Sequence, residues 1–350
     1  MTESYLALES SIDPLTFLTL MTRITQYILP LLFGLLLLSC SKDKQSQQTT
    51  QDEQQTPRVA TPFEADSAYN FVAKQVAFGP RIPGSSGHTA CLAWMKERLT
   101  QYGATVVEQS FEATAHDGTK LPLTNLIASY NPSASQRILL MAHWDTRPWA
   151  DKDPNAANHT EPILGADDGG SGVGVLLEVA RLLGSVAPPQ TIGVDIVLFD
   201  GEDYGSYSNE ESWCLGSTHW SKNPHVADYQ AMGGILLDMV GGRDASFYWE
   251  YFSKSYAPQL LTKVWSKAVE LGYGSYFHQA DGGGLTDDHV PVIRNLGIPC
   301  IDIVNYNPRS EEGFAPYWHT LQDNMSNISA ETLGAVGHTV MAVLKELDAH

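Results

Sequence analysis

Residues 196–203 read Ile-Val-Leu-Phe-Asp-Gly-Glu-Asp, four apolar residues that end abruptly in acids and a glycine. A short, continuous apolar run is typical of a central strand that is covered on both faces of a sheet. Comparable runs occur at 138–142, 235–237 and 298–304. The sequence therefore predicts a buried strand at each of these four positions.

Segments with the spacing of amphipathic helices surround these runs, at 66–78, 89–102, 172–183, 258–271 and 330–347. Strands that alternate with helices predict an α/β fold with a mixed, largely parallel central sheet flanked by helices on both sides. After residue 57 the sequence contains no second linker and no internal repeat. We therefore expect a single α/β domain over residues 58–350.

The composition excludes some classes of protein. Of 350 residues, 21 are Lys or Arg and 40 are Asp or Glu, which gives a formal charge of −19. Nucleic-acid binding is not expected, because it needs a basic face. Hydrophobic residues make up 43% of the chain and charged residues 17%, a composition that predicts a globular protein rather than a disordered one. The four cysteines form no C-x-x-C pair, so a bound metal would need histidine and carboxylate ligands.

The N-terminal region has the features of a bacterial lipoprotein signal. The apolar run 28–38 is shorter than the roughly 20 residues of a membrane span, and residues 1–39 fit a signal region, with Met21 as an alternative start. Leu37-Leu38-Ser39-Cys40 resembles a lipobox, in which Cys40 becomes the lipidated first residue. Residues 40–57 then form a flexible tether. We expect a lipid-anchored protein of the bacterial cell envelope that faces the periplasm or cell surface and contacts the membrane only through Cys40.

Chemically active residues follow the predicted strands directly. The first run ends in His143-Trp144-Asp145, the run at 196–199 in Asp200-Gly201-Glu202-Asp203, and the third in Asp238, while a glycine-rich turn at 165–170 opens a helix. Open α/β sheets bind ligands outside the carboxyl ends of their strands. Taken singly, each residue is at least as consistent with a helix cap, a turn or a surface charge as with a role in a ligand site. Together with His319 they favour a zinc site of carboxylates and imidazoles.

The order of these motifs resembles the metal-site series of the superfamily that contains zinc aminopeptidases and glutaminyl cyclases. The resemblance spans roughly residues 66–348 and rests on His143-x-Asp145, Gly165-Ala166-Asp167-Asp168, Gly201-Glu202-Asp203, Leu237-Asp238 and His319-Thr320. Two segments are similar to the cyclase branch in particular, Thr286-Asp287-Asp288-His289-Val290-Pro291 and Tyr317-Trp318-His319-Thr320-Leu321-Gln322-Asp323-Asn324.

The resemblance implies a role for each matching residue. One zinc ion per chain would be held by Asp168, Asp203 and His319. The catalytic carboxyl groups would be Glu202 as acid/base and Asp238 and Asp287 as an acidic pair behind the substrate amide. The substrate would be bound by Trp318 and His143.

Two features depart from the family pattern. Asp203 stands where the family usually has a glutamate, although aspartate is also a competent oxygen ligand. Animal cyclases carry a further pocket tryptophan shortly after the acid/base, where this chain has only Tyr204, Tyr207 and Trp213. We do not assign these three residues to the pocket.

The resemblance implies a glutaminyl-peptide cyclotransferase, an acyltransferase that acts on peptide or protein N-termini bearing glutamine and releases pyroglutamate and ammonia, and we expect it to act as a monomer. A two-zinc aminopeptidase is the first alternative, because His143 and Asp238 match the second-metal ligands of those enzymes. A peptide- or solute-binding lipoprotein without activity is the second, and the presence of Glu202 argues against it.

The remaining cysteines and histidines are given structural interpretations. Cys91, Cys214 and Cys300 allow at most one disulfide. His88 and six further histidines have no acidic partner in any motif, so we expect them to be structural or on the surface: His116, His159, His219, His225, His278 and His338.

Overall fold

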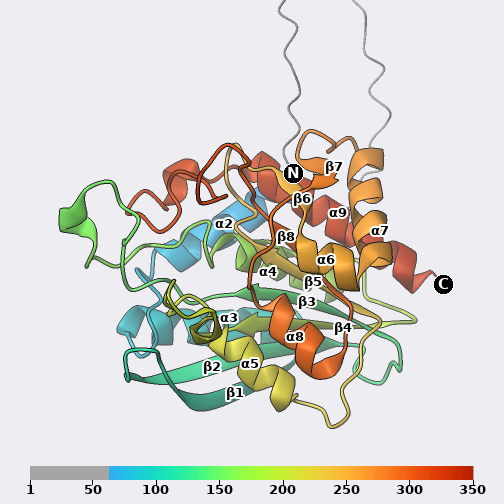
Figure 1. Cartoon of the computed structure of the whole chain (residues 1–350). Helices are drawn as coiled ribbons and strands as arrows, with labels where there is room; N and C mark the ends of the chain where they lie inside the picture. The colour runs from blue at the N-terminus through green and yellow to red at the C-terminus, as the bar shows by residue number, and fades with distance from the viewer. Residues whose placement is uncertain (1–62, 350) are drawn as a thin grey trace, which may run out of the picture. The chain divides into compact units, whose positions relative to one another are not determined.

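Six strands form the central sheet in the order β1-β2-β4-β3-β5-β8 (Figure 1). The computed structural model describes residues 63–349, all of which belong to one compact unit. The strands are β1 Thr105–Thr114, β2 Lys120–Tyr130, β3 Arg137–His143, β4 Gly193–Phe199, β5 Gly233–Asp238 and β8 Cys300–Val304. Strands β4, β3, β5 and β8 are parallel to one another, whereas β1 and β2 add an antiparallel edge. The predicted mixed, largely parallel sheet is therefore confirmed.

The four continuous apolar runs became the four parallel strands. Each residue of β4, β5 and β8 is buried, and so is each residue of β3 after Arg137. β1 differs because it lies at the edge of the sheet, and most of its residues are exposed or half-buried. The second half of β2 is buried in the same way, so burial on both faces extends from β2 across the four parallel strands to β8.

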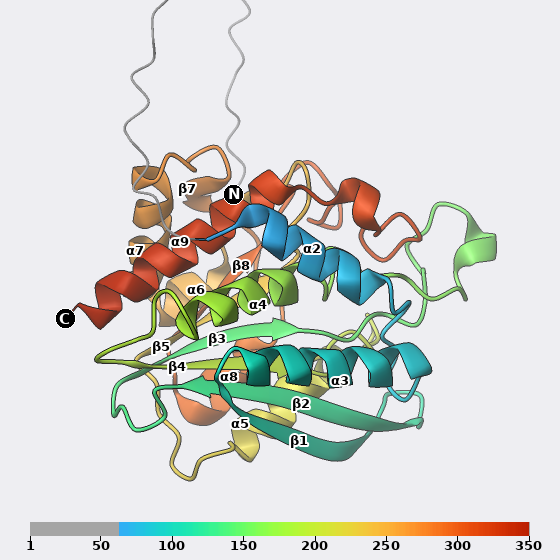
Figure 2. The same cartoon turned by 180° about the vertical axis from the view of Figure 1, so that it is seen from behind.

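Helices cover both faces of the sheet (Figures 1 and 2). They are α2 Ala65–Val76, α3 Ser86–Gln101, α4 Ser171–Leu183, α5 Leu215–Lys222, α6 Tyr251–Tyr256, α7 Pro258–Glu270, α8 His289–Leu296 and α9 Ala330–Asp348, with short 3-10 turns η1 Ala156–Asn158, η2 Glu210–Ser212 and η3 Met325–Asn327. Two short strands, β6 Phe247–Trp249 and β7 Phe277–Asp281, pair in a separate small sheet. None of the helices in this part of the chain is both long enough and apolar enough to cross a membrane.

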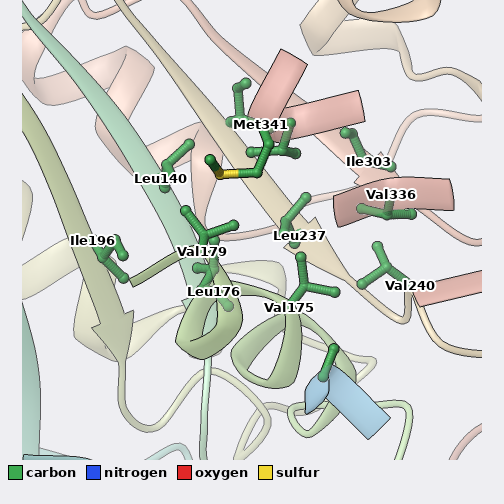
Figure 3. Packing of buried hydrophobic residues seen from close by; sticks show 14 of the residues in the cluster. Leu140, Val175, Leu176, Val179, Ile196, Leu237, Val240, Ile303, Val336 and Met341 are labelled. Atoms are coloured by element: carbon green, nitrogen blue, oxygen red, sulfur yellow. The ribbon is translucent and has the colours of Figure 1, made fainter. Parts of the chain in front are cut away.

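Alternate residues of each strand enter two different cores, as the two-residue period of a strand requires. Leu140 of β3 packs with residues of α4 and α9 in the larger core, as Figure 3 shows. Leu139 and Met141 point to the other face, where Trp220 of α5 and Val292 of α8 cover them. The sheet is therefore held from both sides, which makes its carboxyl edge a rigid platform.

Close contact between α4 and β5 requires a glycine. A side-chain carbon added at Gly172 would lie 2.1 Å from the carbonyl oxygen of Leu237, and Gly172 is fully inside the core. No larger residue allows this approach without displacing backbone. The contact matters because α4 follows Asp168 in the sequence and β5 ends at Asp238.

The three cysteines of the described region are all buried and free: Cys91, Cys214 and Cys300.

Candidate active site

The predicted site residues converge at the carboxyl edge of the sheet. His143 is the last residue of β3 and Asp238 the last of β5, while Glu202 and Asp203 follow β4 within a tight turn. Asp168 lies in the turn before α4, and His319 lies in the loop before η3. This placement follows from topology, because parallel strands bring their carboxyl ends to one edge.

Asp168, Asp203 and His319 form a compact, buried cluster. His319 Nε2 lies 3.2 Å from Asp168 Oδ2 and 3.1 Å from Asp203 Oδ1. Asp168 Oδ2 and both carboxylate oxygens of Asp203 are buried without a hydrogen-bond partner. Buried oxygens without a donor are costly unless a cation satisfies them. Two carboxylates and one imidazole are a donor set that suits zinc, so these three residues fit the implied metal.

A second cluster shares Asp168 with the first. His143 Nε2 lies 3.1 Å from Asp168 Oδ1 and 3.2 Å from Asp238 Oδ1. Asp168 therefore lies between two imidazoles, with one carboxylate oxygen toward each. This geometry accommodates one metal or two, so the ligand positions alone do not separate the cyclase reaction from the aminopeptidase reaction.

Charge interactions shift the pKa values of the first cluster in opposite directions. Burial alone would raise the pKa of Asp168, but the adjacent imidazoles of His143 and His319 hold it below its usual range. Burial alone would lower the pKa of His319, but the carboxylates of Asp203 and Asp168 raise it to about 9. Asp168 is thus held as an anion, which is the form that binds a metal.

The carboxyl groups beside this cluster are shifted toward the protonated form. Burial raises the pKa of Glu202 well above its usual range, and the charges of Asp287 and Asp203 raise it further. Burial raises the pKa of Asp238 to about 8, with a further contribution from Asp287. Burial also raises the pKa of Asp287. A carboxyl group whose surroundings raise its pKa is suited to take and return a proton.

Two buried carboxylates hold the ligand turns in place. Asp145 accepts the backbone N–H groups of Glu202 and Asp203, each at 3.1 Å. Asp323 accepts the backbone N–H of Asp168 at 3.1 Å and that of the preceding residue at 2.8 Å. Sequence reasoning gave neither residue a role. The signal was present, because Asp145 belongs to the His-x-Asp motif and Asp323 to the motif that contains His319.

A cavity of about 480 Å³ opens over Asp168, Glu202, Asp203 and His319. Aromatic and apolar side chains form much of its wall, including Trp318, Trp213, Tyr207, Tyr251, Phe252 and Phe314. The floor is therefore charged and the wall apolar, a combination typical of a small-molecule or peptide-end site.

The lining of the cavity differs from the residues that the sequence analysis assigned to substrate. Tyr207 and Trp213, which we did not assign to the pocket, both line it. Their loop has no periodicity that would predict its course, and only their position shortly after Glu202 hinted at the pocket. His143, expected to bind substrate, is not among the lining residues, because its ring is buried beneath Asp168 and Asp238.

His88 was expected to be structural or on the surface because no motif gives it an acidic partner, and the structure supplies a partner from elsewhere in the chain. Its Nε2 lies 3.0 and 2.9 Å from the two carboxylate oxygens of Asp200, and both side chains are buried. His88 lies near the start of α3 and Asp200 directly follows β4. The two residues are far apart in sequence, so no motif contains both. Its role is structural, as expected for this histidine.

Comparisons with known proteins show which family the chain belongs to. The model of peptidase family M28 matches residues 125–344. The crystal structure of Porphyromonas gingivalis glutaminyl cyclase is 63% identical with a TM-score of 0.81, covering 82% of this chain and 100% of that chain. A Zn-dependent exopeptidase from Parabacteroides distasonis is 53% identical with a TM-score of 0.80, covering 81% and 99%. The glutaminyl-peptide cyclotransferase of Gloydius blomhoffii is 26% identical over 290 residues, 72% of this chain and 73% of the relative. The resemblance that the motifs predicted is confirmed, and the chain belongs to peptidase family M28.

Proposed function

We propose that this protein is a zinc-dependent glutaminyl cyclase that converts N-terminal glutamine of peptides and proteins to pyroglutamate with release of ammonia. The observation that carries the proposal is the match to a glutaminyl cyclase over that enzyme's whole length at 63% identity. The site supports it, because a half-buried acid/base candidate, Glu202, adjoins a metal-binding cluster on the floor of a cavity.

The reaction is an internal acyl transfer. The neutral α-amine of the substrate forms a bond to its own γ-carbonyl carbon, and the bond from that carbon to the amide nitrogen breaks. Glu202 takes the proton that the amine loses and delivers a proton to the departing nitrogen, which leaves as ammonia. Because the attack is intramolecular, the cavity wall contributes chiefly by holding a bent substrate conformer.

We further propose one zinc per chain, held by Asp168, Asp203 and His319. Bound zinc supplies a Lewis acid that stabilises negative charge on the amide oxygen. Asp238 and Asp287 have raised pKa values because burial disfavours their charged forms. Two such acids share a proton more readily than they ionise together. One of them can therefore donate a hydrogen bond to the substrate amide.

A two-zinc aminopeptidase is the second candidate. The second cluster, His143, Asp168 and Asp238, and the relative described as an exopeptidase favour it. Metal analysis of the purified protein separates the two. We expect one tightly bound zinc, whereas two ions that are both lost in His143→Ala would favour the aminopeptidase.

The experiment that tests the proposed function measures ammonia released from two peptides that differ only in their first residue, glutamine or leucine. The zinc-loaded protein should release ammonia from the glutamine peptide alone and leave the leucine peptide intact. The proposal would be overturned if the leucine peptide released free leucine and the glutamine peptide released no ammonia.

We also propose that the protein is a lipoprotein anchored at Cys40 in the bacterial cell envelope, where its partners would be exposed peptide and protein N-termini. The lipobox, the signal region and the tether lie outside the described residues. The proposal is therefore supported by the sequence of residues 28–57 alone.

A further inference from the structure

The imidazole of His319 is held from behind by a tyrosine. Its Nε2 faces the carboxylates of Asp168 and Asp203, and its Nδ1 lies 2.5 Å from the hydroxyl oxygen of Tyr207. A histidine that binds metal through Nε2 carries its hydrogen on Nδ1. Nδ1–H therefore donates to the Tyr207 hydroxyl, which is left free to donate elsewhere.

The Tyr207 hydroxyl passes this interaction to a carboxylate. It donates to Asp151 Oδ1 at 3.5 Å, at the long limit of a hydrogen bond. His319 Nδ1 itself is 4.0 Å from Asp151 Oδ1, too far for a direct hydrogen bond. Tyr207 thus takes the position at Nδ1 where a metal-binding histidine often has a carboxylate as its hydrogen-bond partner.

A buried arginine anchors the arrangement and connects it to the second ligand. Arg147 binds Asp151 with two hydrogen bonds of 2.8 and 2.6 Å. It also donates to the backbone carbonyl of Asp203 at 3.1 Å. The guanidinium carbon lies 5.0 Å from the Tyr207 ring and 4.9 Å from the Trp213 ring, within reach of cation–π attraction. Arg147 therefore contacts Asp151 and Tyr207, which lie behind His319, and also contacts the backbone of Asp203 directly.

His319 needs such support because its backbone is strained. Its φ is +53°, in the left-handed region that residues other than glycine rarely adopt. The ring of Trp318 stacks on its imidazole with 3.8 Å between centroids. Stacking restrains rotation of the ring about the Cβ–Cγ bond, and the hydrogen bond at Nδ1 favours the orientation in which Nε2 faces the two carboxylates.

We infer that Tyr207 is a positioning residue for zinc: its hydroxyl, anchored by Asp151 and Arg147, aligns His319 Nε2 with Asp168 and Asp203. The inference rests on the proposed function, because that proposal supplies the zinc ion. It gives Tyr207, which the sequence analysis left unassigned, a role in the affinity for zinc. Tyr207 also lines the cavity with a half-exposed ring, so only removal of the hydroxyl isolates this role.

The test is Tyr207→Phe, which keeps the ring and removes the hydroxyl. The zinc-loaded protein is titrated with a chromophoric chelator, and the zinc dissociation constant is read from the released metal. Loss of such an outer partner typically weakens metal binding by about 10- to 100-fold, and we expect that change here. The cobalt-substituted variant should also show a shifted visible absorption spectrum.

The matched control is Tyr229→Phe. Tyr229 donates to Asp195 at 2.7 Å, and Asp195 is paired with Arg137, which repeats the Arg-Asp-Tyr arrangement away from the metal cluster. This variant should lose stability but keep the wild-type zinc affinity. Equal zinc affinities in Tyr207→Phe and the wild type would overturn the inference. A wild-type protein that binds zinc but does not cyclise glutamine would refute the proposed function while leaving the affinity comparison valid.

Discussion

Glu202 and Asp203 are neighbours in sequence but have different surroundings. Asp203 faces His319 and Arg147, whereas Glu202 lies beside the Cys214 thiol, with its Oε1 3.6 Å from Sγ. Asp145 binds both of their backbone N–H groups and so fixes the turn that separates the two side chains. A single tight turn therefore supplies a metal ligand and a proton-transfer group.

Replacing Glu202 by glutamine should separate chemistry from metal binding. The variant keeps the size of the side chain and removes the titrating carboxyl group. Zinc content and folding should persist, while kcat falls by roughly 10² to 10⁴, the usual loss for a general acid/base. Metal analysis and steady-state kinetics on a glutamine peptide check this. Asp203→Ala is the control, because it should lose zinc as well. Near wild-type turnover in Glu202→Gln would transfer the proton role to Asp238 or Asp287.

The metal cluster could be predicted from sequence, but its supports could not. Asp168, Asp203 and His319 stand in motifs whose order along the chain matches the family. Tyr207 stands in no motif, and its hydrogen bond to His319 joins residues 112 positions apart. A contact between residues so far apart forms only when the folded chain brings the loop after β4 next to the loop that contains His319. The sequence alone therefore does not reveal it.

At the scale of elements, length decided what could be predicted. The parallel strands and the long helices were predicted because each is a continuous apolar run or spans several helical turns. β6 has three residues and α6 has six, which is too short for a period of 2 or 3.6 to emerge. β1 and β2 are not among the four apolar runs of the sequence analysis. β1 lies at the edge of the sheet, where a strand does not need a continuous apolar run.

Gly172 should be critical because it sets the distance between α4 and β5. Gly172→Ala places a carbon against the carbonyl of Leu237, and relieving this clash should cost about 1–3 kcal/mol of unfolding free energy. Zinc affinity should fall too, since Asp168 precedes α4. Urea denaturation and the chelator titration measure the two effects. Gly274→Ala is the control, because the nearest atom to its added carbon is 3.6 Å away. Equal stability of the two variants would contradict this account of the contact.

At the scale of the whole molecule, the acidic composition fits a site made of carboxylates. The formal charge is −19, and a large share of the buried polar side chains at the carboxyl edge of the sheet are acids. Burying several acids together costs free energy unless protons, hydrogen bonds or a metal compensate them. The metal is therefore expected to contribute to stability as well as to chemistry.

Processing at Cys40 is a prediction about the chain as it is made in the cell. If the lipobox is used, the mature protein begins with a lipid-modified Cys40, and the domain is released in soluble form when the tether is cut. Mass spectrometry of the mature N-terminus from a bacterial host measures this, with Cys40→Ser as the control that should stay unprocessed. Residues upstream of Cys40, or an unmodified thiol there, would contradict it.

The most direct test of the central claim uses one peptide that begins Gln-Leu and the zinc-loaded protein. A cyclase and an aminopeptidase act on this same N-terminus with different products, and intact-mass spectrometry distinguishes them. The account predicts that the peptide loses the mass of one ammonia and becomes blocked to N-terminal sequencing, faster than in a parallel sample with Glu202→Gln. Appearance of free glutamine and a peptide shortened to begin with leucine would contradict it.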